Sequence, residues 1–312
     1  MKLSIIGAGN VGGLTAMRLA EAGVPEIVLV DVAAGIARGK VLDMDDSGSV
    51  LKHSYRISGS GDITAIKGSD IVIVTAGLAR KPGMTREDLL KKNAQILKDV
   101  CLSIKDTCPK SIVIIVTNPL DLMTYLALKV TGFEANRVFG MGVSLDAARF
   151  ANQISKELNI PAAEIDAWVI GSHGEGMLPL PRFTTIKSTN TLNQLLDNEK
   201  VNLLIKKTLE RGLEIVSLLG SGSAYFAPSQ AIAAIVKAIV KDEKRMIGVS
   251  AYLNGEYGIK DICIGVPCRI GKAGIEKVVE LDLNKEELSL LIKSSESISR
   301  NLDLIKPFCH GL

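Results

Sequence analysis

Histidine, cysteine and aromatic residues are scarce in this sequence. The 312 residues include three histidines and five cysteines, and Phe, Trp and Tyr together make up 4%. The cysteines form no C-x-x-C pair and have no histidine at metal-ligand spacing, which excludes the usual zinc patterns, so we expect no metal. A sparse, odd set of thiols in a chain of this length is typical of reduced cysteines and predicts a cytoplasmic protein. These thiols belong to Cys101, Cys108, Cys263, Cys268 and Cys309.

The sequence also lacks an excess of charge of one sign and a long apolar run. Its 37 basic and 34 acidic residues give a net charge of +3, and the basic residues are scattered. This excludes the basic stripe of a nucleic-acid-binding or membrane-surface protein, while small anions remain possible ligands. No apolar run reaches the ~20 residues of a transmembrane helix. The first apolar run begins at Leu3, which leaves no room for a targeting peptide, and we expect a soluble intracellular protein.

The sequence does contain a nucleotide-binding pattern over residues 2–31. An apolar run from Leu3 to Ile6 is followed at once by Gly7-Ala8-Gly9-Asn10-Val11-Gly12, and residues 14–22 then show helical spacing. A second apolar run, residues 27–30, ends in Asp31, about 20 residues after the last glycine of the turn. Strand, glycine turn, helix, strand and terminal acid follow one another in the order of a dinucleotide-binding unit.

Each glycine of the turn predicts a particular contact. Gly7 permits the bend, Gly9 lets the backbone approach a pyrophosphate, and Gly12 lets the helix pack closely on the strand. The free amides of the helix N-terminus would face the phosphates. Asp31 can accept hydrogen bonds from both ribose hydroxyls and repel a 2′-phosphate, and we expect it to be the only charge beside the adenosine ribose. The sequence therefore predicts NAD rather than NADP as cofactor.

Strand and helix patterns alternate to about residue 143. Two β-branched runs are typical of parallel strands buried on both faces. Thr85 predicts a helix start because two acids follow it, and Ser144 is expected to cap a later helix. The expected elements are a helix or loop-helix at 35–47, a strand at 55–58, a strand at 70–75, a helix at 85–106, a strand at 111–116, a helix at 120–130 and a strand at 138–143. This alternation predicts an α/β fold with a Rossmann doubly wound parallel sheet.

The second half of the chain has a different pattern. The expected elements are strands at 166–170 and 177–186, helices at 200–219 and 224–241, an antiparallel meander at 246–253, 261–270 and 274–279, and a helix from 285 to about 302. A chain of 312 residues is longer than one domain usually runs. We therefore expect an NAD-binding domain over residues 1–143, followed by an α+β substrate domain over residues 144–312.

His173 is the main catalytic candidate among the three histidines. It stands among glycines just past an expected strand, which leaves its imidazole accessible. Asp146 and Arg149 are three residues apart on an expected helix and so share a face. An imidazole with a reference pKa of ~6.5 can take a hydroxyl proton, a carboxylate can fix its tautomer, and a planar guanidinium matches a substrate carboxylate. This combination fits dehydrogenation of a 2-hydroxy acid.

A polar segment follows the strand expected at 70–75. Residues 78–85 include Arg80, Lys81, Pro82 and Gly83, and Arg86 comes next. Open α/β sheets bind ligands at the carboxyl ends of their strands, so this segment is expected to lie beside the ligand. Its proline and glycine favour a loop that closes as a lid.

In these motifs the chain resembles the lactate/malate dehydrogenase family, and its malate enzymes in particular, over essentially its whole length. The matching residues are the glycine turn 7–12 with Asp31, AGLARKPGMTR at 76–86, TNP at 117–119, DAAR at 146–149 and GSHG at 171–174. The resemblance implies reversible, NAD-dependent oxidation of (S)-malate to oxaloacetate, with a place in the tricarboxylic acid cycle. It also implies a homodimer or homotetramer, which agrees with apolar residues on more than one side of the helix expected at 224–240.

The resemblance also implies roles for individual residues. His173 would be the proton acceptor with Asp146 as its partner, and Arg149 would hold the C1 carboxylate of the substrate. Arg86 would polarise the substrate carbonyl. The implied cofactor-binding residues are Gly7, Ala8, Gly9, Asn10, Val11, Gly12, Asp31, Asn93, Val116, Thr117 and Asn118, of which Asn118 would also contact substrate. Arg80 would meet the second carboxylate of a dicarboxylate substrate, with Lys81 as the alternative.

Two departures from the family pattern and three alternative functions accompany this interpretation. Glu175 stands where many members carry Asp, and Ala224 stands where the lactate enzymes carry Thr, which agrees with malate.

The nearest alternative is a lactate dehydrogenase or a broad 2-hydroxy acid dehydrogenase. An NAD-dependent glycosidase would need a metal site of Cys and His, and no cysteine lies near His173 in sequence. A non-catalytic NAD-binding relative would be expected to have lost one of these catalytic residues, and all are present.

Overall fold

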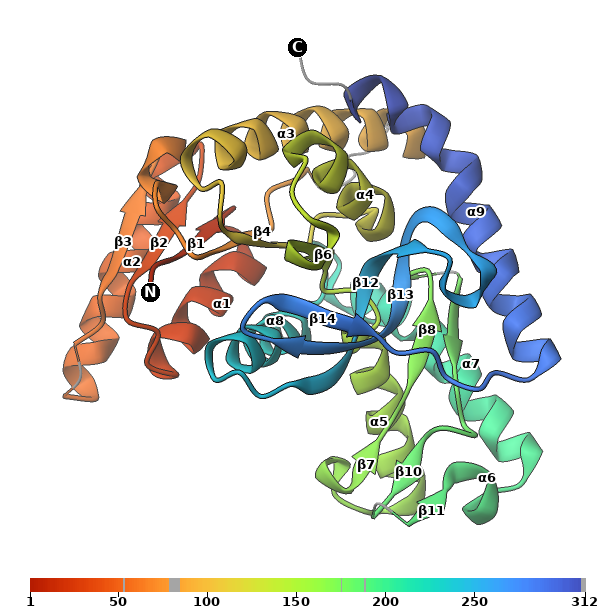
Figure 1. Ribbon diagram of the computed structural model, residues 1–312. Coiled ribbons are helices and arrows are strands. Elements are labelled where there is room, and N and C mark those ends of the chain that lie inside the picture. Colours follow the sequence, from red (N-terminus) through yellow and green to blue (C-terminus); the bar gives the residue numbers. More distant parts are fainter. Residues whose placement is uncertain (53, 79–84, 175, 188, 310–312) are drawn as a thin grey trace.

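Six parallel strands form the sheet of the first half of the chain (Figure 1). The structure, a computed structural model, describes residues 1–52, 54–78, 85–174, 176–187 and 189–309, without the Arg86 side chain. The strands lie in the order β3-β2-β1-β4-β5-β6. Their bounds are β1 (Leu3–Ile6), β2 (Ile27–Val30), β3 (Ile57–Ser60), β4 (Ile71–Val74), β5 (Ile112–Ile115) and β6 (Val138–Gly140). The strand order reverses between β1 and β4, and such sheets bind ligands beside that reversal.

Helices follow the strands of this sheet. They are α1 (Asn10–Glu21), α2 (Ala34–Val50), α3 (Arg86–Thr107), α4 (Leu120–Thr131) and α5 (Ser144–Leu158). Every residue of β1, β2, β4 and β5 is buried, which explains why these strands are apolar except for Ser4 of β1. Thr85 caps α3 in a reciprocal pair of hydrogen bonds with Asp88, as its sequence context predicted. The predicted α/β fold with a doubly wound sheet is confirmed.

Two helix starts differ from the prediction. α1 begins at Asn10 rather than at residue 14, because the last glycine of the turn already lies in the first helical turn. Ser144 does not cap α5: the N-cap is Val143, and Ser144 Oγ instead donates to the carbonyl of Met141 at 2.8 Å.

Two strands of the same half are displaced. The strand expected at 55–58 lies at 57–60, where it pairs with β2. The strand expected at 138–143 ends at Gly140, because Gly142 has a φ of +54° and turns the chain away from the sheet.

An antiparallel meander dominates the second half, as predicted. Its strands are β12 (Arg245–Asn254), β13 (Lys260–Gly271) and β14 (Gly274–Val278). β12 pairs with β6 through Ser250 and Gly140, and β13 pairs with β8 (Val169–Gly171), which pairs with β9 (Met177–Pro179). One sheet therefore continues from the first half of the chain into the second.

Two strands predicted as continuous are each divided. The pattern at 166–170 forms β7 (Ile165–Asp166) and β8, and the pattern at 177–186 forms β9 and β10 (Thr185–Ile186). β7 and β10 form a separate small sheet with β11 (Asn190–Thr191). The division has a local cause, because Thr184 N donates to Leu180 O at 3.0 Å in a turn that leads the chain out of the main sheet.

Of the remaining helices, α7 (Asn198–Leu219), α8 (Phe226–Val240) and α9 (Lys285–Cys309) lie close to their predicted positions. The structure also contains the short helix α6 (Leu192–Leu195) and 3₁₀ turns at Ile63–Ile66, Ala135–Arg137, Ala162–Glu164 and Glu256–Gly258. α6 was not predicted, because a helix of one turn has no periodicity to detect. α9 extends past residue 302 because Ile305 is buried there. α9 runs along one side of the molecule to the end of α3 (Figure 1).

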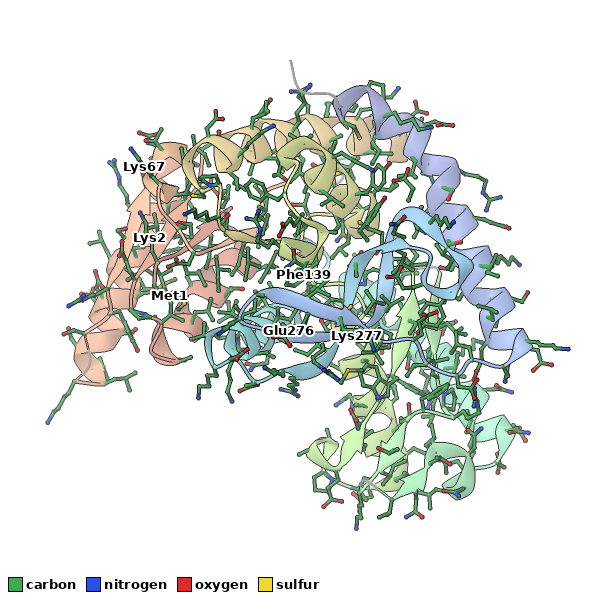
Figure 2. The ribbon with its side chains drawn as sticks, in the orientation of Figure 1. Met1, Lys2, Lys67, Phe139, Glu276 and Lys277 are labelled. Carbon is green, nitrogen blue, oxygen red and sulfur yellow. The ribbon has the colours of Figure 1, made fainter. Side chains whose placement is uncertain are left out.

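The core has two parts. The larger one joins both halves of the chain, and Phe139 of β6, fully buried, lies near the middle of the molecule (Figure 2). The smaller one lies between α5, the first half of α7 and the small sheet. Most of α8, whose apolar residues suggested a subunit interface, packs against α1, α5 and β13 within the chain, while Phe226 and Val240 are exposed. No helix in the described part of the chain is long and apolar enough to cross a membrane.

Candidate active site

The glycine turn lies between β1 and α1, beside the reversal of strand order. Gly7 has a φ of +107°, which favours glycine, and a Cβ on Gly12 would collide with the carbonyl oxygen of Gly7. A Cβ on Gly9 would have no neighbour within 4 Å, so the surface over Gly9 is open. Gly9 is the N-cap of α1 and supplies no side-chain hydrogen bond, which leaves the first amides of the helix for a ligand.

Asp31 lies directly after β2 and borders this turn. Its Oδ2 accepts a hydrogen bond from Ala8 N at 2.7 Å, and its Oδ1 accepts one from Ala33 N at 2.9 Å. A carboxylate has about four acceptor positions, so two remain for ribose hydroxyls. The open turn, the free helix amides and the partly exposed carboxylate together fit a dinucleotide.

A second charged side chain, which was not predicted, lies beside this turn. Lys40 of α2 donates from Nζ to the carbonyl of Gly9 at 2.9 Å. Its side chain passes over Gly13, where a Cβ would lie 2.9 Å from the Lys40 Cδ. Burial lowers the pKa of Lys40, while attraction to Asp31 opposes that shift. No local sequence pattern indicates Lys40, because its position depends on the contact of α2 with α1.

The loops after β4 and β5 lie beside the glycine turn. Thr75 Oγ1 donates to Gly7 O at 2.9 Å, and Thr117 Oγ1 donates to Ala76 O at 2.6 Å. Asn93 of α3 is buried and donates from Nδ2 to Asn118 O at 3.0 Å. The residues predicted to border the cofactor in these loops are thus brought together, and Asn118 is exposed next to the half-buried Val116 and the buried Thr117.

Asn93 is already bonded within the protein. Besides its contact with Asn118, its Oδ1 accepts from Leu78 N at 2.8 Å. The side-chain amide of Asn93 therefore joins α3 to the loops after β4 and β5. Direct contact of Asn93 with a cofactor stays a prediction.

The three predicted catalytic side chains of the second half meet. His173 Nδ1 lies 2.7 Å from Asp146 Oδ2, and Arg149 Nη1 donates to Asp146 Oδ1 at 3.2 Å. Asp146 is fully buried, while the side chains of His173 and Arg149 are 15% and 13% exposed. Each oxygen of the carboxylate therefore contacts one of the two cationic groups, and both groups retain a face toward solvent.

The surroundings of His173 favour its protonated form. Burial lowers the pKa of His173 and is the largest single effect, but attraction to Asp146 and the hydrogen bond with it, together with attraction to Asp121, raise the pKa above its ordinary value. Arg149 repels the imidazolium and acts in the lowering direction. The imidazole therefore holds its proton to a higher pH than a free imidazole does.

Arg149 also has an unused donor. Its Nε is buried and has no hydrogen-bond partner, and a Cβ on Gly212 of α7 would lie 3.4 Å from Nη1. Gly212 therefore lies against the guanidinium, at a distance where a Cβ would make ordinary van der Waals contact. A planar guanidinium with a free donor beside a histidine is suited to a carboxylate ligand.

Three polar residues of this site were not predicted. Ser294 of α9 accepts a hydrogen bond from Ser172 N at 2.9 Å and donates to Gly176 O at 2.8 Å. Asp121 of α4 is buried, and its carboxylate accepts from His173 N and from Ser250 Oγ. The available signal was an acid among apolar residues in α4; a serine in α9 or β12 gives none.

Some predicted residues lie outside the described part of the chain. These are Arg80, Lys81, Pro82 and Gly83 of the expected lid, His53, Glu175 and His310, and the side chain of Arg86. Their roles stay predictions. Among the described residues, no group of three or more His, Cys, Asp or Glu side chains could hold a metal ion.

Two family models match the chain. One describes the lactate/malate dehydrogenase NAD-binding domain and matches residues 1–140. The other describes the lactate/malate dehydrogenase alpha/beta C-terminal domain and matches residues 143–309. The chain therefore belongs to the lactate/malate dehydrogenase family, as the motifs suggested. It is an NAD-dependent oxidoreductase of that family, and the predictions of NAD and of an enzyme are confirmed.

Relatives in this family extend over nearly the whole chain. The malate dehydrogenase of Methanosarcina acetivorans is 48% identical over 301 residues, which are 96% of this chain and 98% of that protein. The structure of malate dehydrogenase from Salinibacter ruber superposes with a TM-score of 0.93 at 40% identity and covers 98% of each chain. Lactate dehydrogenase from Eimeria maxima with NADH and oxamate superposes with a TM-score of 0.94 at 34% identity, covering 98% of this chain and 94% of the other.

Proposed function

We propose that this protein catalyses the reversible, NAD-dependent oxidation of (S)-malate to oxaloacetate, with His173 as proton acceptor. The observation that carries this proposal is the contact of His173 and Arg149 with the two oxygens of the buried Asp146. A proton acceptor and a carboxylate-binding group are the two functions that oxidation of a 2-hydroxy acid requires of the protein. The malate dehydrogenases among the relatives support malate as the substrate.

The proton acceptor in this proposal is Nε2 of His173. Its Nδ1 contacts Asp146 at 2.7 Å, so a neutral imidazole donates from Nδ1 and presents the Nε2 lone pair to the substrate hydroxyl. Proton transfer creates an imidazolium, and the carboxylate beside it stabilises that charge. Bound NAD supplies the hydride acceptor for the C2 hydrogen. In the reverse direction, the imidazolium returns its proton to the forming hydroxyl.

Arg149 would hold the carboxylate at C1 of the substrate. Its Nη1 contacts Asp146 and its Nε has no partner among the described residues, so the guanidinium retains donors for a ligand. By the family resemblance, Arg86 polarises the carbonyl of oxaloacetate and Asn118 contacts both substrate and nicotinamide. The cofactor lies along the residues of the glycine turn, Asp31 and the loops after β4 and β5.

The test is a steady-state rate comparison with four pairs of substrates. Oxaloacetate and pyruvate are each supplied with NADH and with NADPH, and kcat/KM is measured for each pair. We expect the highest value for oxaloacetate with NADH. A preference for pyruvate would instead support the lactate alternative, equal values a broad 2-hydroxy acid dehydrogenase, and no turnover a non-catalytic NAD-binding protein.

Arg80 is the proposed specificity residue within this reaction. A lid that closes over oxaloacetate must supply a positive partner for its second carboxylate. Removal of one partner of a buried ion pair costs roughly 3–5 kcal/mol, which is about a hundredfold to several thousandfold. Arg80→Gln should lower kcat/KM for oxaloacetate by that factor and raise it for pyruvate. Lys81→Gln is the matched control, and loss of the preference only in that variant would move the assignment to Lys81.

The proposed enzyme is a cytoplasmic homodimer or homotetramer of the tricarboxylic acid cycle. Oligomerisation is supported by exposed apolar side chains in the second half of α7, among them Leu213 and Leu218 at 77% and 81% exposure, and in α2, where Val50 is 83% exposed. Division of each subunit at Val143 into a cofactor domain (1–143) and a substrate domain (144–312) agrees with the change from parallel to antiparallel strands there.

A further inference from the structure

Asp121 is a buried carboxylate that the reaction described above does not use. It is 3% exposed and lies in the first turn of α4, a helix in which every residue except Lys129 is buried. Its Oδ2 accepts from His173 N at 2.9 Å and from Ser172 Oγ at 3.0 Å, and its Oδ1 accepts from Ser250 Oγ at 2.6 Å. A carboxylate is costly to bury, so its donors on two other segments indicate a specific role.

Two glycines bring these segments within reach of one another. A Cβ on Gly140 would lie 2.5 Å from Thr124 Oγ1 and 3.1 Å from the Ser250 Cβ, so its absence lets α4 lie close on β6 and β12. A Cβ on Gly142 would lie 2.5 Å from Ser250 N. The backbone is therefore arranged so that α4, β12 and the segment after β8 meet at the Asp121 carboxylate.

The catalytic turn, residues 172–174, is held on two sides. Ser294 of α9 bonds to Ser172 N and to Gly176 O, on either side of His173. Asp121 bonds to His173 N and Ser172 Oγ, which fixes the residue that carries the imidazole. Of these two anchors, only Asp121 can carry a charge.

The electrostatic surroundings of His173 include this charge. Among the described residues, the charged groups that act on His173 are Asp146 and Arg149 of α5 and Asp121 of α4. Burial is the largest effect on Asp121 and raises its pKa above the ordinary value, although the hydrogen bonds from Ser250, His173 and Ser172 and attraction to His173 act in the lowering direction. Burial raises the pKa of the Cys263 thiol in β13, and the nearby Asp121 raises it further.

We propose that Asp121 is a positioning residue for His173, which holds the catalytic turn against α4 and places a second negative charge beside the imidazole. The proposal rests on the assignment of His173 as proton acceptor. Because Asp121 follows the Thr117-Asn118-Pro119 loop on the cofactor side, the same carboxylate joins the cofactor edge of α4 to the catalytic turn.

The test compares Asp121→Asn with the wild type and with Asp261→Asn. Asp121→Asn keeps the size of the side chain and removes its charge. Asp261 is a matched control because its carboxylate also accepts three hydrogen bonds, from Lys129, Tyr125 and Tyr252, and it does not act on His173. The kcat and KM of malate oxidation are measured against pH for each protein.

We expect Asp121→Asn to move the pH midpoint of malate oxidation to lower pH, because loss of the negative charge favours the neutral imidazole. We also expect kcat to fall by about tenfold or more while KM for NAD changes little. Asp261→Asn should leave the midpoint where it is in the wild type. An unshifted midpoint in an active Asp121→Asn enzyme would overturn the proposal.

A second measurement does not depend on activity. NMR titration of the imidazole resonances reports the pKa of His173 directly, with His173→Asn to assign its signal among the three histidines. Ser250→Ala provides a milder variant, because it removes one donor to Asp121 and should lower the pKa of His173 in the same direction. If neither Asp121→Asn nor Ser250→Ala changes the titration of His173, Asp121 does not act on His173. If the titration shifts but the wild type oxidises no malate, the proposed function fails and the positioning of His173 stands.

Discussion

At the scale of single residues, His173 and Asp146 show which contacts a sequence pattern can predict. The helix spacing of Asp146 and Arg149 predicted that they share a face, and the glycines around His173 predicted an accessible imidazole. The resemblance joined the two groups, and the structure places them 2.7 Å apart. Asp121 could not be predicted in the same way, because its partners His173 and Ser250 lie 52 and 129 residues away in sequence.

Replacement of His173 tests the chemistry at this scale. His173→Asn should lower kcat by about 10²–10⁴-fold, because general acid and base catalysis are lost together. Binding of NADH, measured by its fluorescence, should change little, since His173 lies outside the glycine turn. The control variant His310→Asn, at a histidine for which no role is proposed, should retain most activity. A fall of less than tenfold in His173→Asn would remove His173 from the catalytic role.

Lys40 changes the expectation for cofactor choice. With Asp31 alone beside the ribose, a switch to NADPH would need both loss of the acid and addition of a base. Since Lys40 already lies beside the turn, Asp31→Ser alone should raise kcat/KM for NADPH relative to NADH. Asp31→Ser combined with Lys40→Met should lose most of that gain. Equal NADPH use by the single and double variants would show that Lys40 does not act on the cofactor.

At the scale of elements, the strands were predicted best where a run of mainly apolar side chains marks a strand buried on both faces. β1, β2, β4 and β5 are buried on both faces and were recognised as apolar runs. β7 and β10 were misjudged, because each is two residues long and its place is set by a turn and by pairing in a second sheet. Periodicity carries no information at that length.

Replacement of Gly9 and replacement of Gly12 by alanine should have different effects on the protein. Gly12→Ala should destabilise the fold by about 1–3 kcal/mol, because its Cβ meets the carbonyl of Gly7. Gly9→Ala should keep the stability of the wild type, because a Cβ there has open space, but should weaken NADH binding. Thermal unfolding and NADH titration of both variants separate the two effects. Equal stability of the two variants would contradict the packing argument.

At the scale of the whole molecule, the apolar residues left uncovered by the chain predict self-association. The second half of α7 exposes Leu213, Val216 and Leu218, whereas most apolar residues of α8 are buried or half-buried and only its ends expose Phe226 and Val240. Sedimentation at micromolar concentration should therefore give a dimer or tetramer. Leu213→Asp with Leu218→Asp should shift the protein toward monomer if α7 forms the interface, whereas Lys206→Asp at an exposed polar position of the same helix should not. A wild-type monomer would contradict this prediction.

The course of α9 has a consequence for the making of the protein on the ribosome. α9 is translated after every element that it covers, and it packs on α3 and α4 as well as on β8, β9 and β13. Its Leu291, Ile298, Leu302 and Ile305 are buried in the finished molecule. Until these residues leave the exit tunnel, the nucleotide-binding half shows an apolar face to solvent, which is where a chaperone would bind the nascent chain.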